Sequence, residues 1–425
     1  MDIFVGVVVG LVILMILVVA HEFGHFIAAR RNGVRVLEFG IGFPPRAIAW
    51  IKDPQTGKWR KLKRSEWKNN SVAKTVGMGE DSFKTDTKQS GDKKIIQKGL
   101  IFSLNWLPIG GFCQMDGESA EDPRKGTFGN ASFLAKTKIL FAGVAMNWLV
   151  AFIILTVLAW TGMPTFLENQ FTIEADTRVD QTPVKVNSVH ENSPAEKAGF
   201  LSSDYIIKVN TETVTNGSEI TKINKEHAGE EVTYTIKRGD EEKELVATLN
   251  PADSDYLLGV TMESSESLAY SSWSAPIVGA GLTLQITGET FKGLGELVWN
   301  LITGVGRQFS PDDSVRESGR EAIETVGDSV TGPVGILGIL FPSFVSTGPA
   351  NVAFIAALIS ISLACMNVLP IPALDGGRWL LIGYFKLRHK KLTKEIEEKI
   401  VTRAFMILLG LIVIVTILDI TRFFR

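Results

Sequence analysis

Residues 3–25 read IFVGVVVGLVILMILVVAHEFGH, an uninterrupted apolar run that leads into the pentapeptide HEFGH. The apolar part is long enough to cross a bilayer, which takes ~20 such residues. On a helix, His21 and His25 lie four residues apart, so both imidazoles project from one face and can share a metal ion. Glu22 lies beside them, where its carboxylate can take a proton from a metal-bound water molecule. The stretch therefore predicts metal-dependent hydrolysis in or at the edge of a membrane.

A pattern with only three fixed positions also arises by chance, and in a soluble chain the motif alone would be weak. Here the ionisable side chains follow directly on a membrane span, where such groups are costly and rarely serve packing. The N-terminus has no basic region and no small-residue cleavage site, so we interpret residues 3–29 as a retained span. We take His21 and His25 as metal ligands and Glu22 as the general base.

The composition predicts membrane helices combined with at least one soluble domain, because 45% of the 425 residues are hydrophobic and 21% are charged. The net charge of -2 predicts no nucleic-acid partner. Residues 51–100 carry 13 Lys/Arg against 6 Asp/Glu, whereas residues 165–260 carry 9 against 18. A basic and an acidic segment on either side of a span follow the positive-inside rule.

Four segments are predicted to span the membrane: Ile3 to about Ala29, Ile139 to Met163, about Val352 to Leu369, and about Ala404 to Ile420. Basic residues after the first span and between the last two mark the cytoplasmic side. They are Arg30, Arg31, Arg35, Lys386, Arg388, Lys390 and Lys391. We therefore expect a multi-pass protein of the inner or plasma membrane, with both termini and residues 165–350 outside the cytoplasm.

Two regions between the spans are expected to form β-structure. The Lys-rich residues 51–100 suggest a cytoplasmic insertion with a strand pair around Trp59 and Trp67, and the apolar, turn-rich residues 107–112 suggest a re-entrant hairpin. Outside, alternating segments at 184–186, 205–209, 232–236 and 244–248 predict a small antiparallel domain. A short helix is expected at 193–199, with Ser193 as its N-cap and Gly199 closing it.

Residues 275–306 are apolar but contain Glu289, Lys292 and Glu296. This pattern favours an amphipathic helix that lies on the outer membrane surface. A fifth membrane span is the alternative.

A catalytic zinc site takes three protein ligands and keeps one position open for water, so His21 and His25 need a third partner. His190 and His227 fall in the outer domain, and His389 falls in a basic loop. Asp375 follows directly on the third span, at the same predicted cytoplasmic end as the two histidines. We therefore expect Asp375 to be the third ligand.

Two polar residues near the third span each allow a second interpretation. Asp375 begins an Asp-Gly-Gly sequence, which is also a strong turn signal. Asn367 lies within the span and needs a hydrogen-bonding partner there. It can hold an extended substrate backbone or bridge two helices.

The chain resembles the site-2 protease family of intramembrane zinc metalloproteases, in particular the bacterial regulators of sigma factor that carry a PDZ domain. The residues that carry the resemblance are HEFGH at 21–25 with FGIGF at 39–43, PIGGF at 108–112 with MDGE at 115–118, AGVAMN at 142–147, TGPVGI at 331–336, Asn367 to Gly377 with Pro370 and Pro372, and SPA at 193–195 with AGF at 198–200. Val144 and Pro44 depart from the usual family residues, but no expected ligand is missing.

The resemblance implies a polytopic α-helical membrane protein with about four transmembrane helices, a re-entrant β-hairpin and an extracytoplasmic α+β PDZ-like domain. It implies one Zn2+ per chain, held by His21, His25 and Asp375, with Glu22 activating water. Substrate binding is expected at Gly110, Gly111, Phe112, Asn367, Pro370 and Pro372. The expected partners are the lipid bilayer, single-span protein substrates such as anti-sigma factors or signal-peptide remnants, and a site-1-type protease that acts first.

The expected division of the chain follows from these assignments. It comprises 1–50 (first span with the metal motif), 51–135 (cytoplasmic insertion and β-loop), 136–164 (second span), 165–262 (PDZ-like domain), 263–350 (amphipathic helix and linker), 351–385 (third span with LDGG) and 386–425 (cytoplasmic loop and fourth span).

The alternative function is a non-catalytic PDZ membrane scaffold with a vestigial metal site. A structural site needs ligands but no general base, so Glu22 speaks against it. An ion transporter is disfavoured because the sequence lacks paired broken helices in an internal repeat.

Overall fold

The computed structural model describes residues 2–53, 56–64, 99–119, 122–167, 169–181, 183–214, 216–263, 267–330 and 332–423. The chain divides into two compact units, and we describe each by itself. The first comprises Met1–Thr156 and Gly279–Arg425, and the second comprises Val157–Val278. Trp67, one of the two expected strand centres, lies outside the described residues.

Among the described residues, four helices are long and apolar enough to cross a membrane, as the sequence predicted. They are α1 (Asp2–Arg31), α3 (Phe133–Thr161), α10 (Pro349–Val368) and α12 (Lys394–Phe423). The protein is therefore a membrane protein with several helical spans, combined with β-sheet regions.

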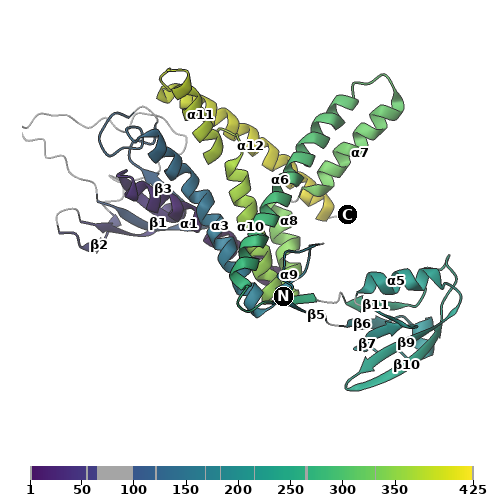
Figure 1. Cartoon of the computed structure of the whole chain (residues 1–425). Coiled ribbons are helices and arrows are strands. Elements are labelled where there is room, and N and C mark those ends of the chain that lie inside the picture. Colours follow the sequence, from purple (N-terminus) through teal and green to yellow (C-terminus); the bar gives the residue numbers. More distant parts are fainter. Residues whose placement is uncertain are drawn as a thin grey trace, which may run out of the picture. The chain divides into compact units, whose positions relative to one another are not determined.

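The long helix α6 (Ala275–Arg307) is not one of these four candidates. It is followed by α7 (Asp313–Ser329), and the two form a helical hairpin (Figure 1). The helices touch at Gly304, where a Cβ atom would lie 3.0 Å from the Gly319 carbonyl oxygen. Leu284, Phe291 and Val298 are exposed at seven-residue intervals along α6 and give it one apolar face. Its placement on the membrane surface stays a prediction.

The polar insertion and the β-loop form one three-stranded sheet in the order β2-β1-β3, made of β1 (Val36–Lys52), β2 (Trp59–Lys61) and β3 (Ile101–Met115). The expected segment 1–50 thus holds α1, which ends at Arg31, and most of β1. Residues 38–41 of β1 pair on both sides, with 111–114 of β3 along one side and with 101–104 along the other. Within the described residues, segment 111–115 is therefore an edge strand of the sheet.

A broken helical segment leads to α10. It consists of α8 (Pro333–Gly335), the π-helix η3 (Ile336–Leu340) and α9 (Phe341–Thr347). Asp419 of α12 is buried and accepts hydrogen bonds from the backbone N–H groups of Gly332 (3.2 Å) and Gly335 (2.9 Å). The carboxylate thus caps the start of α8, where free N–H groups favour an anion. After α10, a turn leads into α11 (Asp375–Leu387).

The second unit contains two antiparallel sheets. The small one has the order β4-β12-β5, with β4 (Met163–Pro164), β5 (Arg178–Gln181) and β12 (Ser267–Tyr270). The large one has the order β10-β9-β7-β6-β11, with β6 (Val184–Val189), β7 (Tyr205–Val209), β8 (Glu212–Thr213, paired with β7), β9 (Glu231–Arg238), β10 (Glu241–Thr248) and β11 (Val260–Glu263). The four predicted strands are confirmed in the large sheet.

Two helices complete the second unit, α4 (Pro194–Ala198) and α5 (Gly217–Glu226). The hydroxyl of Ser193 accepts a hydrogen bond from the Glu196 N–H, and Gly199 closes α4 at φ 87°, as the sequence predicted. The core behind the sheet is built on the fully buried side chains of Ile206, Tyr234 and Ile236.

Asp204 and Arg238 form an ion pair at the end of β9. The carboxylate side chain is 1% exposed, and it accepts hydrogen bonds from Arg238 Nε (2.7 Å) and Nη2 (2.8 Å) and from the Leu201 N–H (2.8 Å). Burial by itself raises the pKa of Asp204. The hydrogen bonds lower this pKa by more than burial raises it, so the pKa lies below its ordinary value of 3.8. Its contribution to stability is therefore present above about pH 4 and is lost as the pH falls through the folded-state pKa.

We expect Asp204→Asn to lower the local free energy of unfolding of β7 and β9 by about 3 kcal/mol, because it leaves a guanidinium without its buried partner. Hydrogen exchange of the full-length protein, referenced to intrinsic rates at each pH, measures this value. Asp180→Asn removes a carboxylate that is 49% exposed beside Arg178, and we expect a change below about 0.5 kcal/mol. Equal effects of the two substitutions would show that the buried pair does not stabilise the domain.

Candidate metal centre

The metal-ligating face of α1 is pressed against α3. A Cβ atom on Gly24 would lie 2.3 Å from the Ala142 carbonyl oxygen, so the two helices meet backbone to backbone. A Cβ atom on Gly143 would lie 2.6 Å from Nε2 of both His21 and His25. The contact therefore depends on residues without side chains on both helices, and it places α3 directly beneath the two imidazoles.

Both histidines are buried, and α3 orients them. His25 Nδ1 lies 2.8 Å from the Ile139 carbonyl oxygen. Because a carbonyl only accepts hydrogen bonds, Nδ1 carries the proton, and Nε2 of the neutral ring presents its lone pair. The Asn147 amide lies 3.4 Å from His21 Nδ1. Both Nε2 atoms point to the same place, because they lie 3.1 Å apart.

Asp375 reaches the histidines because α10 ends at Val368 and α11 begins seven residues later, after a turn that contains Pro370 and Pro372. The glycines after Asp375 let this turn close tightly. A Cβ atom on Gly376 would lie 2.1 Å from the Val368 carbonyl oxygen. The carboxylate therefore lies at the N-terminus of α11, where the helix dipole favours a negative charge.

The three predicted ligands form a compact triangle. Asp375 Oδ2 lies 3.1 Å from His21 Nε2 and 3.3 Å from His25 Nε2, and the histidine atoms are 3.1 Å apart. Ligand atoms about 2.0–2.1 Å from a tetrahedral zinc ion are about 3.3 Å from one another. Among the described residues, this is the cluster of His, Cys, Asp or Glu that can hold a metal ion.

The donor set fits zinc. Two imidazole nitrogens and one carboxylate oxygen leave the fourth tetrahedral position for water, as in catalytic sites. The amide oxygen of Asn147 is buried and has no hydrogen-bond partner among the described residues. If the side-chain amide is rotated by 180°, this oxygen faces His21 Nδ1 and can accept its proton in a hydrogen bond. Nε2 of the neutral His21 ring then offers its lone pair to a metal ion. Electron-rich atoms directed at one point repel each other unless a cation lies between them.

Glu22 connects the triangle to the sheet. It follows His21 on α1, and its carboxylate accepts a hydrogen bond from the backbone N–H of Cys113 in the edge strand. Three other histidines lie elsewhere, as the sequence indicated. His190 stacks on Tyr256, His227 contacts Glu230, and His389 is exposed.

The expected substrate-binding residues fall in two places. Gly110 (φ 72°) lies at the bend of β3, and Gly111 and Phe112 begin the edge strand. Asn367 is the last residue but one of α10, and its amide donates to the Leu363 carbonyl oxygen of its own helix (2.9 Å). Pro370 and Pro372 follow in the turn before Asp375.

Sequence reasoning did not assign Gly143, Asn147 or the Ile139 carbonyl to the site. All three lie on α3, more than a hundred residues from the histidines. The available signal was the polar Asn147 in an apolar span, since such a residue needs a partner there. Its partner is determined by helix packing, which a single sequence does not give.

The spanning helices and the buried His-His-Asp triangle are those of a membrane-embedded metallohydrolase. The chain belongs to peptidase family M50, whose model matches residues 9–59 and 91–411. It is 27% identical to the zinc metalloprotease RasP of Shouchella clausii, over 97% of this chain and 98% of that protein. It is 26% identical to the regulator of sigma-W protease RasP of Bacillus subtilis, over 99% of this chain and 100% of that protein.

Solved structures are similar to part of the chain. The PDZ domain of the SdrC-like protein from Listeria monocytogenes matches 19% of this chain and 87% of its own, with 21% identity and a TM-score of 0.18. Membership of family M50 makes the protein an intramembrane zinc metalloprotease. The sequence-based function is confirmed, and the scaffold alternative is not supported.

We expect Gly143→Ala to weaken zinc binding about tenfold or more, because the added methyl group would overlap both Nε2 atoms. Zinc per chain, measured by mass spectrometry after competition with a chelator, reports the change. Gly288→Ala is the matched control, since it adds the same methyl group to helix α6 in open space. Unchanged zinc affinity in Gly143→Ala would mean that α3 does not support the ligands.

Proposed function

We propose that the protein cleaves the transmembrane segments of single-span proteins with one zinc ion held by His21, His25 and Asp375. The triangle of 3.1–3.3 Å between their ligand atoms carries this proposal. When bound, zinc polarises a peptide carbonyl and lowers the pKa of a water molecule. The carboxylate of Asp375 would supply the one negative charge among the three ligands, which partly neutralises a divalent cation.

Glu22 supplies the general base. Glu22 interacts electrostatically with His21, His25 and Asp375, so its carboxylate lies near the position where water would bind and can accept the proton that water loses. The same carboxyl group can then donate the proton to the leaving amine. The Cys113 N–H fixes the orientation of the carboxylate with one hydrogen bond.

We expect Glu22→Gln to reduce cleavage of a single-span substrate by roughly a hundredfold or more and to keep about one zinc per chain. Purified protein in detergent, with cleavage followed on gels and zinc quantified in parallel, tests both properties. Asp375→Asn is the comparison, since it should lose zinc and activity together. A Glu22→Gln protein that cuts as fast as the wild type would rule out Glu22 as the base.

The substrate has to be extended, because the carbonyl groups of a helix are hydrogen-bonded and shielded. The edge strand 111–115 offers C=O groups for strand addition. Two of its N–H groups are already used, because those of Cys113 and Met115 donate to Glu22 and Glu118. We propose that the substrate pairs there, along Gly110, Gly111 and Phe112. The hydrogen bond from Cys113 to Glu22 supports this, because an added strand would run beside the catalytic carboxylate.

Two features support a substrate path that reaches into the membrane. The bend of β3 exposes Trp106, Leu107 and Ile109, which are 67%, 50% and 61% exposed. An exposed apolar tip of this kind suits lipid or an apolar substrate. The second feature is the non-helical turn between α10 and Asp375, which contains Pro370 and Pro372 and follows Asn367. We propose that these three residues contact the substrate backbone.

Strand addition predicts a period of two in cross-linking. In a Glu22→Gln chain with alanine in place of both cysteines, Gln114→Cys should form disulfides with every second position of a substrate scanned with single cysteines. Lys61→Cys, on the opposite edge strand β2, is the control and should give little cross-linking. A period of three to four residues would show that the substrate docks as a helix, and equal yields at both edges would exclude a specific edge.

We propose that the physiological substrates are anti-sigma factors or signal-peptide remnants, cut after a first cleavage by a site-1-type protease. A relative named regulator of sigma-W protease supports the first class. The basic loops favour an orientation with the metal site toward the cytoplasm and the PDZ-like domain outside. In this arrangement the domain acts as a size filter that admits only trimmed substrates.

A further inference from the structure

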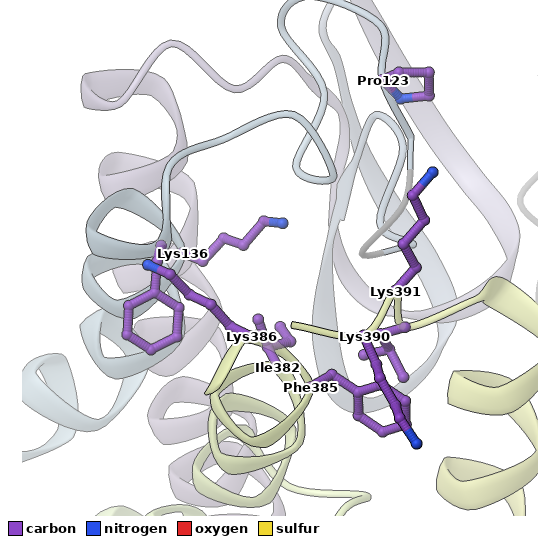
Figure 2. A pocket seen from close by; sticks show the side chains of 9 residues that line it. Pro123, Lys136, Ile382, Phe385, Lys386, Lys390 and Lys391 are labelled. Carbon is purple, nitrogen blue, oxygen red and sulfur yellow. The ribbon is translucent and has the colours of Figure 1, made fainter. Parts of the chain in front are cut away.

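A cavity of about 540 Å³ lies in the first unit, and its lining includes none of His21, His25 and Asp375. Its walls come from the loop before α3, the first turn of α3, the end of α11 and the following loop. The lining residues are Pro123, Phe133, Lys136, Ile382, Phe385, Lys386, Lys390, Lys391 and Leu392. Figure 2 shows Lys136 and Lys386 on one side and Lys390 and Lys391 on the other.

The cavity carries four positive charges and no carboxylate in its lining. No acidic side chain in the described part of the chain forms an ion pair with Lys386, Lys390 or Lys391. Lys136, the fourth lysine, donates a hydrogen bond to the Gly129 carbonyl oxygen (2.8 Å). The positive charges of Lys386, Lys390 and Lys391 repel each other, and an anion bound in the cavity would relieve this repulsion.

The rest of the lining is apolar. Ile382 and Leu392 are 8% and 5% exposed, and Phe133 and Phe385 add two rings. Lys386 Nζ lies 4.4 Å from the centroid of the Phe133 ring. Phe133 is also the first residue of α3, a candidate membrane span, so the cavity lies where the chain enters the apolar layer. A small soluble anion needs no such apolar wall, whereas an amphiphilic anion does.

We propose that this cavity binds the phosphate headgroup of an anionic phospholipid, such as phosphatidylglycerol or cardiolipin. The lysines hold the phosphate, and the apolar lining receives the glycerol and the start of the acyl chains. The bound headgroup bridges α3 and α11. These helices carry the Ile139 carbonyl and Asp375, so the lipid holds together two elements that build the metal site.

Native mass spectrometry of the full-length protein tests the site, with phosphatidylglycerol, phosphatidylcholine or inorganic phosphate added in detergent. The test variant carries Lys386→Gln, Lys390→Gln and Lys391→Gln. The matched control carries Lys52→Gln, Lys58→Gln and Lys61→Gln, which remove the same charge from the sheet. All six lysines are exposed, so the fold should be kept, and equal zinc content in the three proteins verifies this.

We expect wild type and control to retain one phosphatidylglycerol that phosphatidylcholine does not replace. The test variant should bind it roughly a hundredfold more weakly, since each lysine near a lipid phosphate contributes about fivefold. Equal binding by the test variant and the control would overturn the proposal, as would equal retention of phosphatidylcholine. Inorganic phosphate that displaces the lipid and binds as tightly would assign the cavity to a soluble phosphate instead.

Discussion

The close approach of α1 and α3 is the constraint on which the metal site depends. Gly24 and Gly143 let the two backbones touch, and this contact puts the Ile139 carbonyl 2.8 Å from His25. Two histidines four residues apart share a helix face by geometry alone, but their rings remain free to rotate. The hydrogen bond to Ile139 and the Asn147 amide select the ring nitrogen that faces the metal position. The second helix thus turns a common sequence motif into a site with one geometry.

The third ligand depends on more distant packing. Arg378, one turn after Asp375 on α11, donates to the Glu118 carbonyl oxygen and to Glu397 of α12 (3.1 Å). Its guanidinium also lies 5.0 Å from the Phe128 ring. These contacts tie the start of α11 to the end of the β-sheet and to the last span. The carboxylate position is therefore fixed by three elements rather than by the Asp-Gly-Gly turn alone, which makes a chance turn aspartate a poor explanation of this sequence.

Local sequence patterns predicted much of this structure, because spans, caps and ligand spacing depend on neighbouring residues. Asp375 could be placed because basic loops fix which span ends lie on the same side. The sheet around β1 was mostly missed. Its residues 38–41 pair on both sides. Gly40, Gly42, Pro44 and Pro45 interrupt this part of the sequence, and such residues argue against a strand. Gly143 and Asn147 escaped assignment because their partners on α1 are set by tertiary contact alone.

The position of the edge strand follows from the physics of peptide cleavage in lipid. Converting six helical residues to a strand lengthens the segment by roughly 11 Å and breaks its internal hydrogen bonds. In a layer without water, each unpaired N–H or C=O group costs several kcal/mol. A sheet edge next to the general base removes most of that cost, because the substrate exchanges one set of backbone partners for another. The hydrogen bond from Cys113 to Glu22 brings this edge and the catalytic carboxylate into direct contact. In the mechanism that we propose, unwinding and hydrolysis therefore take place at one location.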